Sequence, residues 1–219
     1  MKRFLLLLAL AAAAPQAMAA DEDISKVNGS IHTNAGTHYR DLDTVNGSIQ
    51  LASGVSARGV ETVNGSVRIE DNVTARSIET VNGAIRSGRN LVLSNGLETV
   101  NGSIFVDRGS RIGGGVATVN GGIGLVATQV EGDIETVNGD ITVGVDSVVK
   151  GGIKVERPSF GISFKAPRKP RIIIGPNAVV EGALVFEREV TLHVHDSARI
   201  GAVSGATIQR YNTETAPAN

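Results

Sequence analysis

The chain has 219 residues, of which 27 are Gly and none is Cys, and its 21 Lys and Arg residues nearly balance its 22 Asp and Glu residues. A formal net charge of -1 leaves no basic surplus for a polyanionic partner, so the composition argues against nucleic-acid binding. The absence of Cys excludes disulfides, thiolate metal sites and thiol nucleophiles.

Residues 1–20 have the pattern of a secretory signal peptide. Two basic residues precede an apolar run over residues 4–14, and Ala17-Met18-Ala19 provides a cleavage site of small residues. We expect cleavage after Ala19 or Ala20 and export to the periplasm or cell surface. Retention as an anchor is the alternative, although a membrane span needs ~20 apolar residues. We expect no transmembrane segment after signal cleavage.

A Val-Asn-Gly motif recurs along the next part of the chain. Its Val residues are separated by steps of 18, 18, 18, 19, 19 and 18, and they are Val27, Val45, Val63, Val81, Val100, Val119 and Val137. A fixed period of this size is typical of a solenoid, in which each unit buries its apolar face only when its neighbours stack on it.

Apolar residues within one unit show the spacing of strands. In one copy they are Val63, Val67, Ile69, Val73 and Ile78, and the pair two residues apart places both side chains on one strand face. We expect these residues, the Val of the motif included, to point inward, and the Asn-Gly to supply positive φ at a corner. The prediction is an all-β fold, a single-stranded and right-handed parallel β-helix (β-solenoid) with 18–19 residues per turn and a filled core.

The regularity of the repeat changes along the chain. We expect a regular β-solenoid over residues 21–145 and degenerate turns over residues 146–205, interrupted by a basic, Pro-rich loop at 156–171. This loop is either solvated or in contact with an anionic envelope polymer or lipid headgroups. We expect residues 206–219 to form a polar tail with few apolar side chains to bury.

Two family resemblances follow from these motifs. The ladder of Glu-Thr-Val-Asn-Gly-Ser-Ile copies over residues 24–145 resembles a bacterial family of exported, adhesin-type β-solenoids. The stretch Ile174-Gly175-Pro176-Asn177-Ala178-Val179-Val180-Glu181-Gly182 is similar to the bactofilins. That resemblance implies polymer-forming right-handed β-helices that assemble end to end without nucleotide. Bactofilins act at the cytoplasmic side, whereas this chain begins with an export signal, and neither resemblance implies a catalytic motif.

Stacking of the repeats predicts a column of Asn side chains with one member per turn. Because a buried amide must find hydrogen-bond partners, we expect a structural ladder in which each amide bonds to the next, with ligand binding as the alternative. The members are Asn28, Asn46, Asn64, Asn82, Asn101, Asn120 and Asn138.

A second predicted column is acidic and is broken by Ala117. Like charges in register repel, so its side chains either spread into solvent, pair with Arg58 and Arg76, or hold cations such as calcium. The members are Asp43, Glu61, Glu79, Glu98 and Glu135.

Metal binding has two sets of candidate ligands. His193 and His195 flank Val194 and offer two nitrogen ligands to zinc or copper, and Glu61, Glu79 and Glu98 offer oxygens. Neither set makes a complete site, so we expect no metal and no cofactor.

The chain shows no constellation of acid, base and nucleophile that predicts catalysis. We therefore expect a non-enzymatic structural or interaction protein, a rigid scaffold or adhesin. Its expected partners are a second copy, joined end to end, or components of the cell envelope or surface, because the open end of a solenoid exposes strand edges. The alternatives are a cation- or ligand-binding envelope protein and, less favoured, a polysaccharide-active enzyme.

Overall fold

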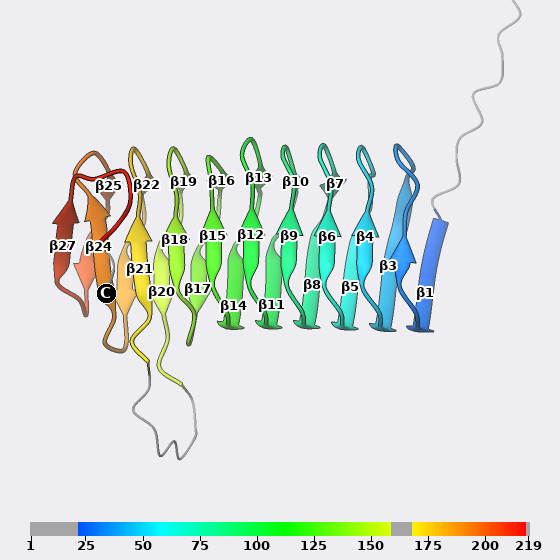
Figure 1. Cartoon of the computed structure of the whole chain (residues 1–219), viewed down its shortest axis with the longest axis horizontal. Coiled ribbons are helices and arrows are strands. Elements are labelled where there is room, and N and C mark those ends of the chain that lie inside the picture. Colours follow the sequence, from blue (N-terminus) through cyan, green and yellow to red (C-terminus); the bar gives the residue numbers. More distant parts are fainter. Residues whose placement is uncertain (1–21, 159–167, 218–219) are drawn as a thin grey trace, which may run out of the picture.

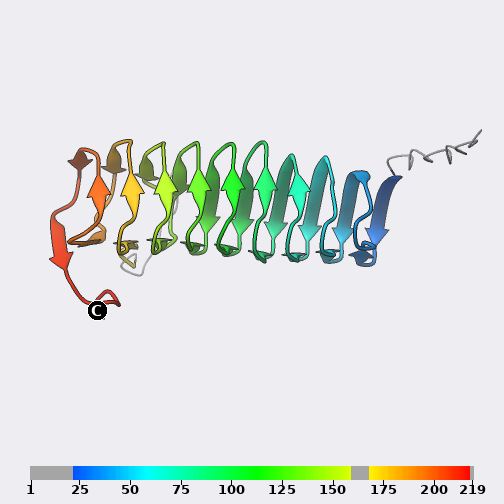
Figure 2. The same cartoon turned by 90° about the horizontal axis from the view of Figure 1, so that it is seen from above.

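The computed structural model describes residues 22–158 and 168–217, and these residues form 27 β-strands and no helix. The strands form stacked coils in an elongated rod, with β1 at one end and β27 at the other (Figures 1 and 2). The expected signal peptide and residues 159–167 of the expected basic loop lie outside the described residues. No segment within the described ranges forms a helix that could span a membrane.

Three parallel sheets run along the rod; every coil contributes a strand to sheets A and B, and sheet C begins at the third coil. Sheet A has ten strands, in the order β1 (Glu22–Asn28), β3 (Tyr39–Asn46), β5 (Gly59–Asn64), β8 (Ser77–Asn82), β11 (Leu97–Asn101), β14 (Val116–Asn120), β17 (Ile134–Thr136), β20 (Ile153–Val155), β23 (Leu184–Phe186) and β26 (Val203–Ser204).

Sheet B also has ten strands, in the order β2 (Ile31–His32), β4 (Ile49–Leu51), β6 (Val67–Ile69), β9 (Ile85–Ser87), β12 (Ile104–Val106), β15 (Ile123–Leu125), β18 (Ile141–Val143), β21 (Arg171–Ile174), β24 (Thr191–His195) and β27 (Ile208–Tyr211). Sheet C has seven: β7 (Thr74–Ala75), β10 (Val92–Leu93), β13 (Arg111–Ile112), β16 (Gln129–Val130), β19 (Val148–Val149), β22 (Val179–Val180) and β25 (Arg199–Ile200).

The register confirms the predicted β-solenoid. Each strand pairs in parallel with the equivalent strand one coil away, so that Glu61 lies beside Glu79 and Glu79 beside Glu98. Because neighbouring parallel strands lie about 4.8 Å apart, equivalent residues recur at that interval along the rod. One coil therefore corresponds to one copy of the sequence repeat.

The interior of the coils is filled by aliphatic side chains. Leu42, Ile78 and Leu97 of sheet A and Ile49 and Ile85 of sheet B are each 0% exposed. Each fully buried side chain of this size contributes roughly 1.5–3 kcal/mol through the hydrophobic effect. Stacking thus supplies the burial that no single coil achieves alone.

The expectation that the Val of the motif points inward is wrong. Val45, Val63 and Val81 are each 40% exposed, whereas the preceding Thr62 and Thr80 are 4% and 5% exposed. Side chains alternate along a strand, and the aliphatic residue two positions before each Thr faces the core. The Thr therefore also faces inward, and the Val that follows it faces outward.

The expectation that the motif's Asn-Gly supplies positive φ at its corner is also wrong for most copies. Only two of the seven motif glycines, Gly29 and Gly121, have a positive φ. At Gly47, Gly65 and Gly83, an added Cβ would instead lie far inside contact distance of the Gly carbonyl oxygen in the preceding coil. Glycine is required there because the corners of successive coils approach closely.

Positive φ recurs in eight successive coils at a different corner, between sheets B and C. The residues that adopt it are mostly Gly, Asn and Asp, which tolerate the left-handed region: Gly36, Gly54, Asn72, Asn90, Gly109, Ala127, Asp146 and Asn177. This column also repeats at the coil period in the sequence. It marks a turn that the prediction of positive φ at the Asn-Gly motif did not include.

Two predictions for the C-terminal half need correction. The loop at 156–171 does not interrupt the stack, because β18 pairs directly with β21 across it, and Arg171 already belongs to β21. The expected polar tail contains a strand, since β27 pairs with β24. Tyr211 in β27 is only 7% exposed and its hydroxyl donates to the carbonyl of Ile174 at 3.2 Å.

Candidate interaction surfaces

The Asn residues of the motif form a continuous row along one corner of the rod. Each amide nitrogen donates to the side-chain oxygen of the Asn one coil earlier, at 2.9–3.0 Å, in the series Asn28, Asn46, Asn64, Asn82, Asn101, Asn120 and Asn138. All seven side chains are exposed, which corrects the expectation of buried amides. The row stabilises the corner while one side of every amide stays open to solvent.

The Thr before each motif supports the same corner from inside. Thr62 and Thr80 donate their hydroxyl hydrogens to the carbonyl oxygens of Gly47 and Gly65, one coil earlier, at 2.8 and 2.9 Å. These are the oxygens that the next motif glycine approaches so closely. Thr, Asn and Gly of the motif therefore all act in coil stacking, and the Val is free to face outward.

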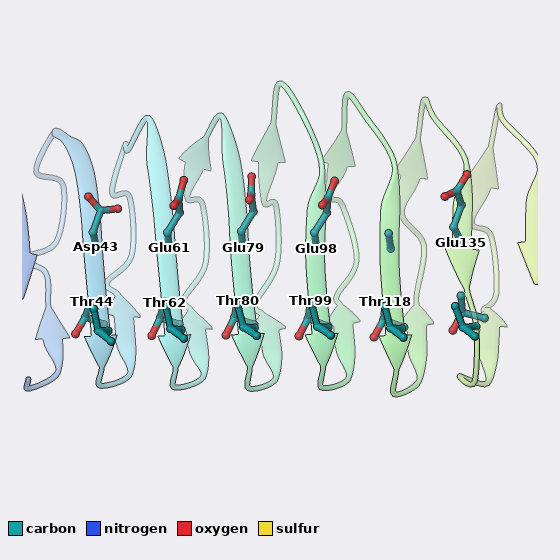
Figure 3. Close-up of a pocket in the computed structure, with 18 of the residues that line it drawn as sticks. Asp43, Thr44, Glu61, Thr62, Glu79, Thr80, Glu98, Thr99, Thr118 and Glu135 are labelled. Carbon is teal, nitrogen blue, oxygen red and sulfur yellow. The ribbon is translucent and has the colours of Figure 1, made fainter. Parts of the chain in front are cut away.

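The acidic residues form a row on the outer face of sheet A. Figure 3 shows the side chains of Asp43, Glu61, Glu79 and Glu98 on successive strands, with Glu135 beyond the gap at residue 117. The Glu side chains are exposed and Asp43 is half-buried. At an interval of about 4.8 Å, their like charges repel one another.

A cation lies at one end of this row, because Lys154 of β20 is in register with Glu135 of β17, although its ammonium bonds to Glu156 at 2.6 Å. Among residues 22–158 and 168–217, the ion pairs leave Glu61, Glu79 and Glu98 without a partner. The expected pairing of Arg58 with Glu61 is wrong, because Arg58 lies 3.6 Å from Asp41.

The row is electrostatically strained. Burial raises the pKa of Glu79, and the Glu61 and Glu98 carboxylates on either side raise it further. Burial and the Asp41 carboxylate likewise raise the pKa of Asp43. Both shifts mean that a nearby positive charge would stabilise the ionised row.

Exposed valines run parallel to the carboxylates, two residues further along each strand of sheet A. Their exposed fractions are 37–40% from the second to the sixth copy: Val45, Val63, Val81, Val100 and Val119. Together with the carboxylates they line a shallow groove of about 490 Å³ that extends from Ser25 to Glu156. We call this surface the sheet A groove.

The two candidate His ligands lie on β24 in different surroundings. His193 is 5% exposed, its Nδ1 has no hydrogen-bond partner, and burial and then Arg171 lower its pKa. His195 Nδ1 lies 2.8 Å from the Ser197 hydroxyl, and its ring meets Tyr211 edge-on at 5.1 Å. No group of three His, Asp or Glu in the described part of the chain is arranged to hold a metal ion.

The ends of the rod differ in how they cover the core. At the C-terminal end, Ile208 is 38% exposed and Ile200 and Val203 are partly exposed, whereas Leu192 and Leu184, their neighbours one coil earlier on sheets B and A, are 0% exposed. These inward-facing residues have no further coil stacked on them.

At the other end, the core is better covered, although Ile24 of β1 is partly exposed, and the strand edge is free. Ile31 is 1% exposed and Tyr39 is 4% exposed, with the Tyr39 hydroxyl accepting a hydrogen bond from the Asn34 backbone at 3.0 Å. Among the described residues, β1 pairs with β3 alone, so its outer edge retains unpaired backbone groups.

Comparison of the chain with models of protein families, with curated proteins and with solved structures finds no match. The surfaces described above are therefore interpreted from their own chemistry.

Proposed function

We propose that the protein is a non-enzymatic scaffold of the bacterial cell envelope, an exported solenoid that associates end to end with further copies. The observation that carries this proposal is the last coil, whose inward column in sheet B is left uncovered at Ile208 and Arg210. Ile208 continues the inward column of sheet B and is 38% exposed, although the equivalent Leu192 is fully buried. A further coil on this end would bury it in the way that every internal coil is buried.

The opposite end offers a matching surface. β1 of a second copy has a free edge in sheet A, and β26 forms the last edge of sheet A in the first copy. Pairing β26 with β1 would continue the parallel sheet and place β27 against β2 in sheet B. Such a head-to-tail contact joins two different surfaces and leaves both outer ends free, so it generates filaments rather than closed dimers.

The structure also supports a role as a passive element. The motif residues with hydrogen-bonding side chains are used in coil stacking, as shown by the Asn row and the Thr62 and Thr80 hydroxyls. The resulting rod is stiff because backbone hydrogen bonds join each coil to the next along three parallel sheets. Stiffness and a repeated surface are the properties that a scaffold needs.

Sedimentation velocity of the chain from residue 21 onward tests the proposal over a range of protein concentrations. We expect species of increasing length for the native sequence and a loss of them in Ile208→Asp, which places a charge on the end surface. Val185→Asp is the matched control, because Val185 is 37% exposed but faces sideways from sheet A. A monomer at all concentrations, or equal assembly by both variants, contradicts end-to-end association.

A further inference from the structure

The sheet A groove combines two features that a scaffold does not need. One wall carries carboxylates, of which Glu61, Glu79 and Glu98 have no ion-pair partner among the described residues, and the other carries valines that are 37–40% exposed. Neither feature follows from coil stacking, because both columns point away from the core. The side chains between them, such as Thr80, are buried and bonded to the preceding coil.

The spacing of the groove selects between possible partners. Carboxylates and valines each recur at about 4.8 Å along the rod axis. An extended peptide lying along this axis repeats its side chains on one face every ~6.8 Å and falls out of step within two coils. An α-helix has a pitch of 5.4 Å, so that side chains about one turn apart follow the coils closely.

We propose that the sheet A groove binds a cationic amphipathic helix lying along the rod axis. One Lys or Arg per turn would face the carboxylate row, and one apolar side chain per turn would contact the valine row. From Asp43 to Glu135 the row spans five intervals, or about 24 Å, which corresponds to about 16 helical residues.

Charge and burial both favour this occupant. Positive side chains would relieve the repulsion within the carboxylate row. The mismatch of about 0.6 Å per turn accumulates to about 3 Å over the five intervals, a distance that the flexible stems of Lys and Arg would absorb. The apolar stripe of the helix would cover the exposed valines, which explains why this face is not simply polar. The inference is independent of end-to-end association, because the groove lies on the side of the rod.

The gap in the row supplies a sharp test of register. Ala117 lies between Glu98 and Glu135 in the pairing of β11, β14 and β17. Its side chain occupies the carboxylate position of that coil without charge. Replacement Ala117→Glu would complete an uninterrupted row of six carboxylates, from Asp43 to Glu135.

The probe is a synthetic 18-residue peptide of Leu and Lys in helical order, titrated by calorimetry with helix content followed by circular dichroism. A peptide of the same composition in alternating order is the control for helical spacing. We expect the helical peptide to bind with a gain in helix content and with an affinity that falls as salt is added.

Variants of the protein decide whether binding occurs in the groove. We expect Glu61→Gln/Glu79→Gln/Glu98→Gln to weaken binding about tenfold and Ala117→Glu to strengthen it. The charge-matched control is Glu131→Gln/Glu181→Gln/Glu189→Gln, which removes three exposed carboxylates outside the groove. Circular dichroism of each variant verifies that the solenoid remains folded.

Two results would overturn the proposal. Equal weakening by the two triple variants would mean that the peptide responds only to net charge. Equal binding of the alternating and helical peptides would mean that the groove does not select helical spacing.

Discussion

The close approach of coils at the motif corner predicts an unusual sensitivity to the smallest side chain. In Gly83→Ala, the new Cβ would overlap the carbonyl oxygen of Gly65 in the preceding coil, and no flexible side chain is available to move aside. The corner would have to open. Because Gly83 does not have a positive φ, backbone strain is not the cause, and the whole effect comes from this contact.

The expected cost follows from the contacts at this corner. Overpacking in a close-packed region costs about 1–3 kcal/mol. Opening the corner also weakens the bonds that join these two coils there, from the Thr80 hydroxyl to the Gly65 carbonyl and from the Asn82 amide to the Asn64 side chain, each 2.9 Å, at ~1 kcal/mol each. An entropic gain of ~0.4–1 kcal/mol from replacing Gly in the unfolded chain offsets part of this. The net destabilisation is about 2–5 kcal/mol.

Gly122→Ala provides the matched control, because it lies directly after a motif glycine. Its added Cβ would meet only the Asp140 carbonyl oxygen, at 3.6 Å. The equivalent position two repeats earlier already holds an alanine, Ala84. Urea denaturation followed by circular dichroism measures both variants. We expect a much lower midpoint for Gly83→Ala and an unchanged or slightly higher midpoint for Gly122→Ala. Equal midpoints would refute the argument that contact between corners determines the glycine.

Three further predictions concern the columns. Asn82→Ala removes two ladder hydrogen bonds and Asn28→Ala removes one, so in urea denaturation the first should cost about twice as much free energy, roughly 1–2 kcal/mol; equal costs would contradict a cooperating ladder. Burial and neighbouring carboxylates raise the pKa of Glu79 above its ordinary value of 4.5. The ionised Glu79 therefore lowers the unfolding free energy at neutral pH, and this cost disappears as the pH falls through the raised pKa toward 4.5. Glu79→Gln should therefore raise the unfolding free energy by a few tenths of a kcal/mol at pH 7 and lose this advantage below pH 4.5, as denaturation at both pH values would show. Ala127 has a φ of 42° in a column of Gly, Asn and Asp, so Ala127→Gly should relieve about 1–2 kcal/mol of backbone strain. The greater freedom of Gly in the unfolded chain offsets ~0.4–1 kcal/mol of this gain, so the thermal midpoint should rise slightly, and a lowered midpoint would contradict the strain.

Much of the fold follows from the period of the sequence. The steps of 18 and 19 residues predict the coils, and the apolar pairs such as Val67 and Ile69 predict the inward face of sheet B, where both are buried. These inferences succeed because burial requires the same side-chain chemistry at the same place in every coil.

Sequence alone does not show which residues of the sheet A strands face inward, and therefore which side chains line the groove. Thr62 and Val63 are both β-branched, and hydrophobicity alone favours burying the Val. The inward Thr is acceptable only because a carbonyl of the preceding coil accepts its hydroxyl hydrogen, a partner that is visible only in three dimensions. The column of Gly36, Gly54 and Asn72 also recurs at the coil period, and this recurrence is the signal that predicts its positive φ. The Asn-Gly motif is more regular and was assigned the positive φ instead.

The most direct test of the proposed scaffold is cryo-electron microscopy of the assembled rods at a resolution that separates strands. We expect the spacing of about 4.8 Å to continue without a break across the junction between copies, with β26 of one copy paired to β1 of the next. Rods joined side by side, or a junction that leaves Ile208 in contact with solvent, would contradict it.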